Sequence, residues 1–281
     1  MQQGEVWRIG ETLLEPPAVL GPPQIALAAE AGYAEVLVRP LPRVAVLATG
    51  NELLPPGAPL EPGKIRNSNG SVLVASVRQA GCAAVDLGTA PDDAATLGSA
   101  IARGLASADV LVLSGGVSAG VLDLVPAALA ACGVEQVLHR VRIKPGQPLW
   151  FGVRRGAEGD QPVFGLPGNP VSTFVCFQVF VRPLLERLGA PRLLARLQPA
   201  VLAADHFQKG DRPTYFPAVL EAGPASASPR VRAVSWQGSS DLRGLAQANC
   251  LAVFPAGDRQ FLTGEVVEVL PLAPALPGGS L

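Results

Sequence analysis

The sequence predicts an α/β protein: a doubly wound, three-layer α/β domain, followed by a small β-barrel domain and preceded by a short N-terminal segment. Between residues 42 and 190, short apolar runs alternate with helical stretches, a pattern typical of a parallel sheet with helices on both faces. After residue 190 the helical periodicity gives way to short β-type runs, which indicates a small barrel or sandwich. We therefore expect domains at 1–41, 42–190 and 191–281.

The N-terminal segment carries two strand-like pieces, at 4–10 and 35–38, around one amphipathic helix at 22–31. Two strands and one helix cannot bury enough surface to make a core alone. We therefore expect this segment to be the remainder of a larger region.

The α/β domain opens with a strand at 43–49 and a helix at about 70–80, which Asn69 or Ser68 can cap because their side-chain oxygens accept from its free N–H groups. The helix at 93–107 carries acidic residues in its first turn, as the helix dipole favours. The strand predicted at 109–114 contains an apolar run, 110–113, that is rich in β-branched residues, as expected for a strand buried on both faces. The remaining predicted elements are strands at 83–87, 134–143, 149–153 and 163–166, and helices at 122–131 and 171–188.

The C-terminal domain contains five short β-type runs bounded by Gly, Pro and Asp, which mark turns between strands. We expect these runs to be the strands of the barrel. They lie at 199–204, 215–220, 230–236, 251–254 and 265–270.

Composition excludes several function classes. The net charge is only -1, so no basic excess argues for nucleic acid. Cys82, Cys132, Cys176 and Cys250 are widely separated among apolar residues, which predicts small buried side chains in a reducing cytosol rather than disulfides or a metal site. No signal pattern opens the chain, and no apolar run reaches the roughly 18 residues that span a bilayer. We expect a cytoplasmic protein that binds neither nucleic acid nor membrane.

Gly-rich loops fall at the carboxyl ends of predicted strands, where open α/β sheets bind their ligands. Ser114-Gly115-Gly116-Val117-Ser118 follows one strand and precedes a helix. Its backbone N–H groups and two hydroxyls could bind an anion. The alternative is a tight turn without a ligand.

A second loop adds cations to this edge. Arg140, Arg142 and Lys144 alternate at the spacing of a strand, and Lys144 directly precedes Pro145-Gly146. We expect the three to share one face, with Lys144 held at a fixed turn. A solvated edge strand explains the alternation equally well.

Three acids also follow predicted strands: Glu52, Asp92 and Asp123. Carboxylates at this edge could bind a metal, accept from the N–H donors of a heterocycle, or cap helices. For Asp92 and Asp123, capping of the next helix explains the position as well as a functional role does.

Five motifs, taken together, are specific to one family. They are Thr49-Gly50-Asn51-Glu52-Leu53, Ile65-Arg66-Asn67-Ser68-Asn69, Ser114-Gly115-Gly116-Val117-Ser118, Lys144-Pro145-Gly146 and Gly165-Leu166-Pro167-Gly168-Asn169-Pro170-Val171-Ser172. They occur in the order found in the molybdopterin molybdenumtransferase family (MoeA and the E domain of gephyrin), which the chain resembles. The resemblance covers residues 43–190 and, with fewer matching residues, the β-rich end and residues 4–40.

Members of that family take adenylylated molybdopterin, release AMP and insert molybdate into the dithiolene, assisted by a divalent cation such as Mg²⁺. The resemblance implies a molybdopterin-binding α/β domain whose catalytic residues are Glu52, Asp92, Asp123, Arg140 and Lys144, with Glu52 and Asp123 as metal ligands. The implied pterin and molybdate site comprises Asn69, Ser114, Gly115, Gly116, Ser118, Pro148, Gly168, Asn169, Ser172, Arg212 and Ser239. Molybdate is a tetrahedral dianion that needs cations together with hydroxyl or N–H donors, while phosphate cleavage needs positive charge and a metal held by carboxylates.

The chain departs from the family pattern at three positions and in one region. Gln147 stands where the family usually has the second lysine of Lys-Pro-Gly-Lys-Pro, Asn51 where an Asp is common, and Thr214 where an acid usually follows the Arg212 position. The family's long N-terminal region, with its Pro-Phe-Asp-Asn-Ser-Ala-Met-Asp-Gly-Tyr-Ala signature, has no match in this sequence. The chain therefore resembles an N-terminally truncated member.

These features leave two functions open. The first is an enzyme that takes part in molybdate insertion, alone or with a separate chain that supplies the missing region. The second is a catalytically incomplete carrier or companion subunit that binds molybdopterin, to which Gln147 and the missing region point. A relative that shares only the α/β domain, such as the molybdopterin adenylyltransferases, is disfavoured by the β-rich end. Because the family dimerises through a region that residues 1–40 partly match, we expect a homodimer.

Overall fold

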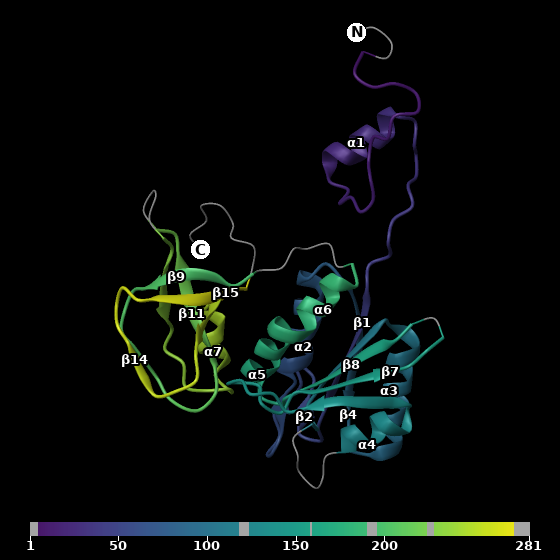
Figure 1. The fold of residues 1–281 in the computed structure, drawn as a ribbon. Helices are drawn as coiled ribbons and strands as arrows, with labels where there is room; N and C mark the ends of the chain where they lie inside the picture. The colour runs from purple at the N-terminus through teal and green to yellow at the C-terminus, as the bar shows by residue number, and fades with distance from the viewer. Residues whose placement is uncertain (1–4, 118–123, 158, 190–195, 224–227, 273–281) are drawn as a thin grey trace. The chain divides into compact units, whose positions relative to one another are not determined.

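A computed structural model describes residues 5–117, 124–157, 159–189, 196–223 and 228–272 of the chain (Figure 1). The chain divides into two compact units, Met1–Pro40 and Leu41–Leu281. Among the described residues, no helix is long and apolar enough to cross a membrane.

The first unit contains one helix, α1 (Pro22–Glu30), which confirms the predicted helix. Two prolines occupy its first positions, where their fixed φ suits a helix start and their missing N–H is not needed. The two predicted strand-like pieces are wrong, since residues 5–40 contain no strand. None of these residues is buried, so nothing in the unit supports a sheet.

The second unit is built on a six-stranded sheet with the order β4-β1-β5-β8-β7-β6. Strands β4, β1, β5 and β8 are parallel, as predicted, but β7 runs antiparallel to both of its neighbours. The prediction of an all-parallel sheet is therefore corrected to a mixed sheet. The segments before and after β7 are too short for the crossover that a parallel strand needs. The strands are β1 (Arg43–Thr49), β4 (Ala83–Ala90), β5 (Val110–Ser114), β6 (Val134–His139), β7 (Trp150–Arg154) and β8 (Gln161–Leu166).

Helices cover both faces of this sheet and make two cores, as the sequence predicts. Alternate residues of β1 enter opposite cores: Val44 and Val46 one, Ala45 and Leu47 the other, all fully buried. The first core includes residues of α2, α5, η1 and α6, and the second includes residues of α3 and α4. The helices are α2 (Ser68–Gln79), α3 (Ala94–Ser107), α4 (Leu124–Ala131), α5 (Pro170–Cys176), the π-helical turn η1 (Phe177–Val181) and α6 (Arg182–Arg187). The last three form the predicted helix at 171–188, interrupted by the π turn.

Two predicted helix starts are corrected. Asn67, not Asn69 or Ser68, caps α2, because its side chain accepts from Gly70 N. Asp93 lies before the first turn of α3 as its N-cap and accepts from Thr96 N at 2.8 Å, so that turn itself holds no acid. Both caps satisfy N–H groups that the first helical turn leaves unpaired.

The β-rich end closes into a five-stranded barrel with the order β11-β12-β9-β15-β13 (Figure 1). Its strands are the five predicted runs: β9 (Gln198–Leu202), β11 (Thr214–Glu221), β12 (Arg230–Ala233), β13 (Cys250–Phe254) and β15 (Val266–Pro271). The sequence did not predict the short elements β2 (Leu53–Leu54), β3 (Ile65–Arg66), β10 (His206–Gln208), β14 (Arg259–Phe261) and α7 (Leu242–Ala246). Elements this short lack a detectable hydrophobic period. The predicted boundary near residue 190 stays a prediction.

The cysteines are the small apolar side chains that the sequence predicts. All four are free, and Cys82, Cys176 and Cys250 are buried, whereas Cys132 is half-buried. Burial raises the pKa of Cys82 to about 11 and that of Cys250 to about 12, which keeps both thiols protonated and unreactive.

The barrel joins the α/β part at the turn that begins with Lys144. Lys144 N donates to Pro213 O at 2.9 Å, and Tyr215 N donates to Lys144 O at 2.8 Å. The turn continues into Gly146, whose φ of 118° suits glycine alone. A Cβ at this position would lie 2.5 Å from Cys176 Sγ in α5. The turn is therefore fixed by the barrel on one side and by α5 on the other.

We expect Gly146→Ala to lower the free energy of unfolding by about 2 to 5 kcal/mol, the sum of a strained backbone and a clash with Cys176. Gly257→Ala is the matched control, since Gly257 has a φ of 121° but no atom within 4 Å of an added Cβ. It should lose only the backbone part, about 1 to 3 kcal/mol. Urea unfolding measures both losses, and equal losses would show that the clash contributes nothing.

Candidate functional site

The carboxyl ends of β1, β5 and β8 meet at a cavity of about 720 Å³. Strands β2 and β3, which pair in parallel after β1, also contribute residues to its lining. Its lining includes the following predicted site residues: Glu52, Asn69, Asp92, Ser114, Gly115, Gly116, Pro148, Gly168 and Asn169. The sheet edge therefore gathers loops from positions far apart in the sequence, as expected for an open α/β sheet.

The Gly115-Gly116 loop approaches β1 and α4 so closely that side chains would not fit. A Cβ on Gly115 would lie 2.4 Å from Thr49 O, and one on Gly116 would lie 2.6 Å from Val125 Cγ2. Both glycines have positive φ, 95° and 63°. Gly115 N donates to Leu166 O at 3.1 Å, so this N–H, which the sequence predicted to be available to an anion, is used within the sheet.

Asn69 links the start of α2 with the end of β5 and with the loop after β8. Its Nδ2 donates to Ser114 Oγ at 2.8 Å and to Gly168 O at 2.6 Å. The Ser114 hydroxyl also lies 3.5 Å from Thr173 Oγ1, and Ser114 is almost fully buried. These contacts make Asn69 and Ser114 a buried network that sets the spacing of the loops.

Glu52 and Asp92 bring carboxylates to the same cavity. Asp92 Oδ2 accepts from Asn51 N at 3.2 Å, and Asp92 N donates to Asn51 Oδ1 at 3.0 Å. Asp92 therefore does not cap α3, contrary to that alternative for its position, because Asp93 holds the cap. Both carboxylates are exposed to solvent.

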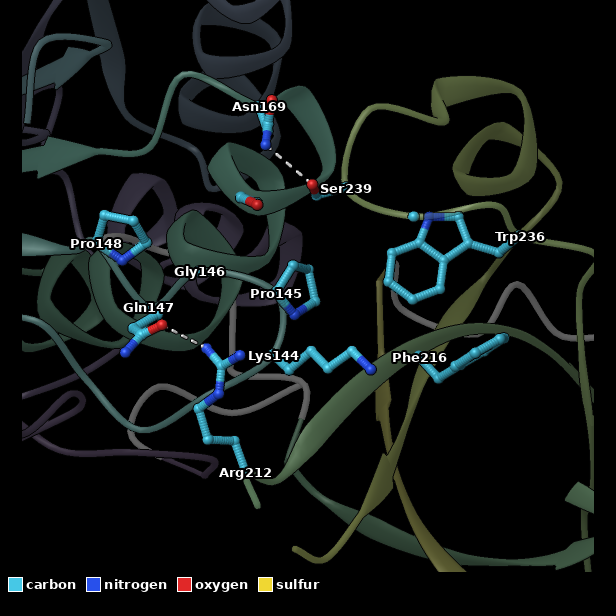
Figure 2. A pocket seen from close by; sticks show the side chains of 12 residues that line it. Lys144, Pro145, Gly146, Gln147, Pro148, Asn169, Arg212, Phe216, Trp236 and Ser239 are labelled. Atoms are coloured by element: carbon cyan, nitrogen blue, oxygen red, sulfur yellow. Dashed lines mark hydrogen bonds between the residues drawn. The ribbon is translucent and has the colours of Figure 1, made fainter. Parts of the chain in front are cut away.

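A second cavity of about 470 Å³ adjoins the first, since Pro148 and Asn169 line both. It lies between the turn that begins at Lys144, the start of α5 and the barrel (Figure 2). Lys144, Ser172, Arg212 and Ser239, all predicted site residues, line it. This cavity is thus lined by two cations, two hydroxyl groups and two prolines.

The Arg212 guanidinium is held from two directions. Its Nη1 donates to Gln147 Oε1 at 2.8 Å and to Ile143 O at 3.3 Å. Lys144 Nζ lies 3.4 Å from Lys209 O, on a loop of the barrel. Arg212 is therefore the more firmly oriented cation of the two.

The barrel also completes the start of α5. Asn169, the N-cap residue, makes no side-chain bond to the helix. Val171 N donates instead to Ser239 O at 3.0 Å, and Asn169 Nδ2 donates to Ser239 Oγ at 2.9 Å (Figure 2). Ser239 thus lines the smaller cavity and also accepts the first N–H group of α5.

One predicted site residue, Arg140, is not brought into either cavity by the structure. Arg140 has a φ of 70°, is exposed, and is not part of either lining. Strand β6 ends at His139, so the expectation that Arg140, Arg142 and Lys144 share one face of a strand is wrong. Asp123 and Ser118 lie outside the described residues.

Two aromatic residues of the smaller cavity were missed by sequence reasoning. Phe216 and Trp236 line it, with ring centroids 5.0 Å apart in an edge-to-face arrangement. Both were assigned only to barrel strands. The position of Trp236 directly before Gln237-Gly238-Ser239 was the available signal.

Two family models match the chain. A probable molybdopterin binding domain matches residues 45–187, about half of the chain. The MoeA C-terminal region (domain IV) matches residues 199–272, which hold most of the barrel.

Relatives and solved structures agree with these matches. Molybdopterin molybdenumtransferase 2 of Mycobacterium tuberculosis is 37% identical over 276 residues, which are 95% of this chain and 66% of that protein. Molybdopterin molybdenumtransferase of Staphylococcus aureus is 33% identical over 95% of this chain and 63% of its own length. The structure of a molybdopterin biosynthesis MoeA protein from Pyrococcus horikosii has a TM-score of 0.74 and 32% identity, and the match covers 91% of this chain and 60% of that one. The chain thus spans slightly less than two thirds of the length of these proteins.

We expect Asn69→Ala to lower the free energy of unfolding by about 1 to 3 kcal/mol, because Gly168 O and Ser114 Oγ lose a buried donor. Ser68→Ala, in the same helical turn but without a side-chain hydrogen bond in the structure, should stay within about 0.5 kcal/mol. Urea unfolding of both variants checks this. A loss for Asn69→Ala no greater than that for Ser68→Ala would contradict a structural role of the network.

Proposed function

Because the chain belongs to the MoeA family of molybdopterin molybdenumtransferases, we propose that it binds adenylylated molybdopterin and takes part in molybdate insertion with release of AMP. The observation that supports this most directly is the pair of adjoining cavities. The larger brings acids and glycine loops together, and the smaller brings two cations and two hydroxyls together.

The smaller cavity fits molybdate. A tetrahedral dianion needs positive charge and several hydrogen-bond donors, and charge-assisted bonds to it are the strongest available. Lys144 and Arg212 supply the charge, and the hydroxyls of Ser172 and Ser239 supply donors. We assign this cavity to the molybdate that the reaction consumes.

The larger cavity fits a phosphorylated pterin. Its carboxylates, Glu52 and Asp92, can accept from the N–H groups of a heterocycle, and Arg66 in the same lining can pair with a phosphate. Pro148 and Asn169 lie between the two cavities. A pterin in the larger cavity would therefore lie next to an anion in the smaller one.

A divalent cation would assist cleavage of the phosphate bond by neutralising charge on the leaving AMP. Oxygen ligands suit Mg²⁺, and Glu52 and Asp92 line the same cavity, so the donor chemistry fits. No cluster of three or more candidate metal ligands occurs within the described ranges. Substrate phosphates and waters commonly complete such a Mg²⁺ site. We propose Glu52 as the principal protein ligand, together with Asp123.

The remaining roles implied by the resemblance are also proposals. We assign Asp92 to the pterin side of the larger cavity and keep Arg140 as a residue that a bound nucleotide could reach. We further propose that the protein acts as a homodimer, or with a separate chain that contributes residues to the site.

A second function is favoured by one observation. Gln147 lines the smaller cavity with a neutral side chain and is already bonded to Arg212, so only two cations face that space among the described lining residues. With less positive charge, the chain could hold molybdopterin without completing the transfer. It would then act as a carrier or companion subunit.

We expect the purified chain, given adenylylated molybdopterin, molybdate and Mg²⁺, to release AMP and load molybdenum, measured by chromatography and metal analysis. Lys144→Ala should slow AMP release about 10- to 100-fold, since it removes a preorganised cation. Arg155→Ala removes an equally charged but exposed side chain outside both cavities and should change the rate less than about twofold.

Absence of both AMP release and molybdenum loading would refute the enzymatic function. Binding of the pterin without turnover would establish the carrier function in its place. Equal rates of AMP release for Lys144→Ala and the unchanged chain would show that Lys144 does not contribute to the reaction.

A further inference from the structure

Gln147 connects the two halves of the smaller cavity. It follows Gly146 in the α/β part, whereas Arg212 lies in the loop before β11 of the barrel. The hydrogen bond from Arg212 Nη1 to Gln147 Oε1 is 2.8 Å long (Figure 2). It is the shortest contact that the structure gives the Arg212 side chain.

The other contacts of Arg212 fix it less firmly. The bond from Nη1 to Ile143 O is 3.3 Å long. Asp211 Oδ1 is 3.6 Å from Nε, but the Asp211 side chain is 84% exposed, and such ion pairs contribute little. Without Gln147, the long arginine side chain would therefore regain much of its rotamer freedom.

The chemistry of the glutamine amide matters as much as its position. A carboxylate in this place would also hold the guanidinium, but it would cancel the positive charge of Arg212. An ammonium group would repel it. An amide oxygen orients Arg212 and leaves the charges of Arg212 and Lys144 uncancelled. The second terminal nitrogen of the guanidinium is directed away from Gln147 (Figure 2), and both Arg212 and Lys144 line the cavity.

We propose that Gln147 is a positioning residue that holds Arg212 ready for a tetrahedral oxyanion and keeps the cavity selective for dianions over monoanions. The inference rests on the assignment of this cavity to molybdate. Selectivity by charge follows because the Coulomb energy scales with the product of the charges. Holding the guanidinium in advance removes part of the ordering cost of binding.

The test is equilibrium binding of molybdate, a dianion, and perrhenate, a monoanion of the same tetrahedral shape, measured by calorimetry at low salt. Gln147→Leu should weaken molybdate binding about 3- to 10-fold through loss of the tether. Gln147→Glu should weaken it more than about 10-fold, and should weaken perrhenate binding less, so that the preference for the dianion falls. Gln260→Leu, an exposed change on β14 outside both linings, is the control and should bind as the unchanged chain does.

A double-mutant cycle separates positioning from direct contact or general damage. If Gln147 acts through Arg212, Gln147→Leu should have no further effect in an Arg212→Leu background, whereas independent contributions would add. Additive losses of molybdate affinity, or unchanged binding by Gln147→Leu, would overturn the positioning role of Gln147 but not the assignment of the cavity. Absence of molybdate binding by the unchanged chain would refute the assignment of the cavity and this role with it.

Discussion

The smaller cavity depends on the backbone hydrogen bonds that fix Lys144 between two segments of the chain. Its N–H and C=O are both used by residues 213 and 215, in a short parallel bridge to the barrel. A bridge of this kind fixes the position of the Cα atom through backbone groups alone. Because Arg212 immediately precedes the bridged segment, the same bonds bring both cations to one place. Charge that would be spread over two loops is thereby concentrated in one cavity.

This arrangement divides two kinds of chemistry between neighbouring spaces. Two acids, Glu52 and Asp92, line the larger cavity together with Arg66, whereas the described lining of the smaller cavity holds two cations and no acid; Pro148 and Asn169 line both. Such an arrangement suits the proposed reaction, in which a phosphorylated pterin and molybdate must meet in adjoining spaces. The Glu52 carboxylate and an oxyanion would repel each other within one space, and two adjoining cavities keep them apart.

Sequence reasoning predicted most of the architecture, because hydrophobic period and turn residues report local structure directly. It found the helices of the α/β part and all five barrel strands. Sequence reasoning did not predict that β7 is antiparallel, because a buried apolar run has the same pattern in either direction. The placement of Arg140 was mispredicted for a different reason. The alternation of charged residues in the sequence does not reveal that a non-glycine residue adopts a positive φ.

The candidate site shows the same limit more sharply. The motifs predicted which loops converge, and the structure brings nine of the predicted residues to the larger cavity. They could not show that Gly115 N–H is already used by Leu166, or that Gln147 and Arg212 are bonded. Both facts depend on pairs of residues far apart in the chain, and no local pattern encodes such a pair. The contact between Phe216 and Trp236 in the smaller cavity also joins residues that lie apart in the chain.

The start of α5 has a consequence for how the protein holds together. Its first amide donor finds an acceptor only in Ser239, and Val171 and Val175 pack with Leu245 and Leu251 from the barrel. The C-terminal part of the chain therefore covers apolar side chains and a helix start of the α/β part. If the barrel detached, it would uncover apolar side chains and an unpaired N–H in one step. Melting of the two parts should be cooperative, and a nucleotide or oxyanion that steadies one will steady the other.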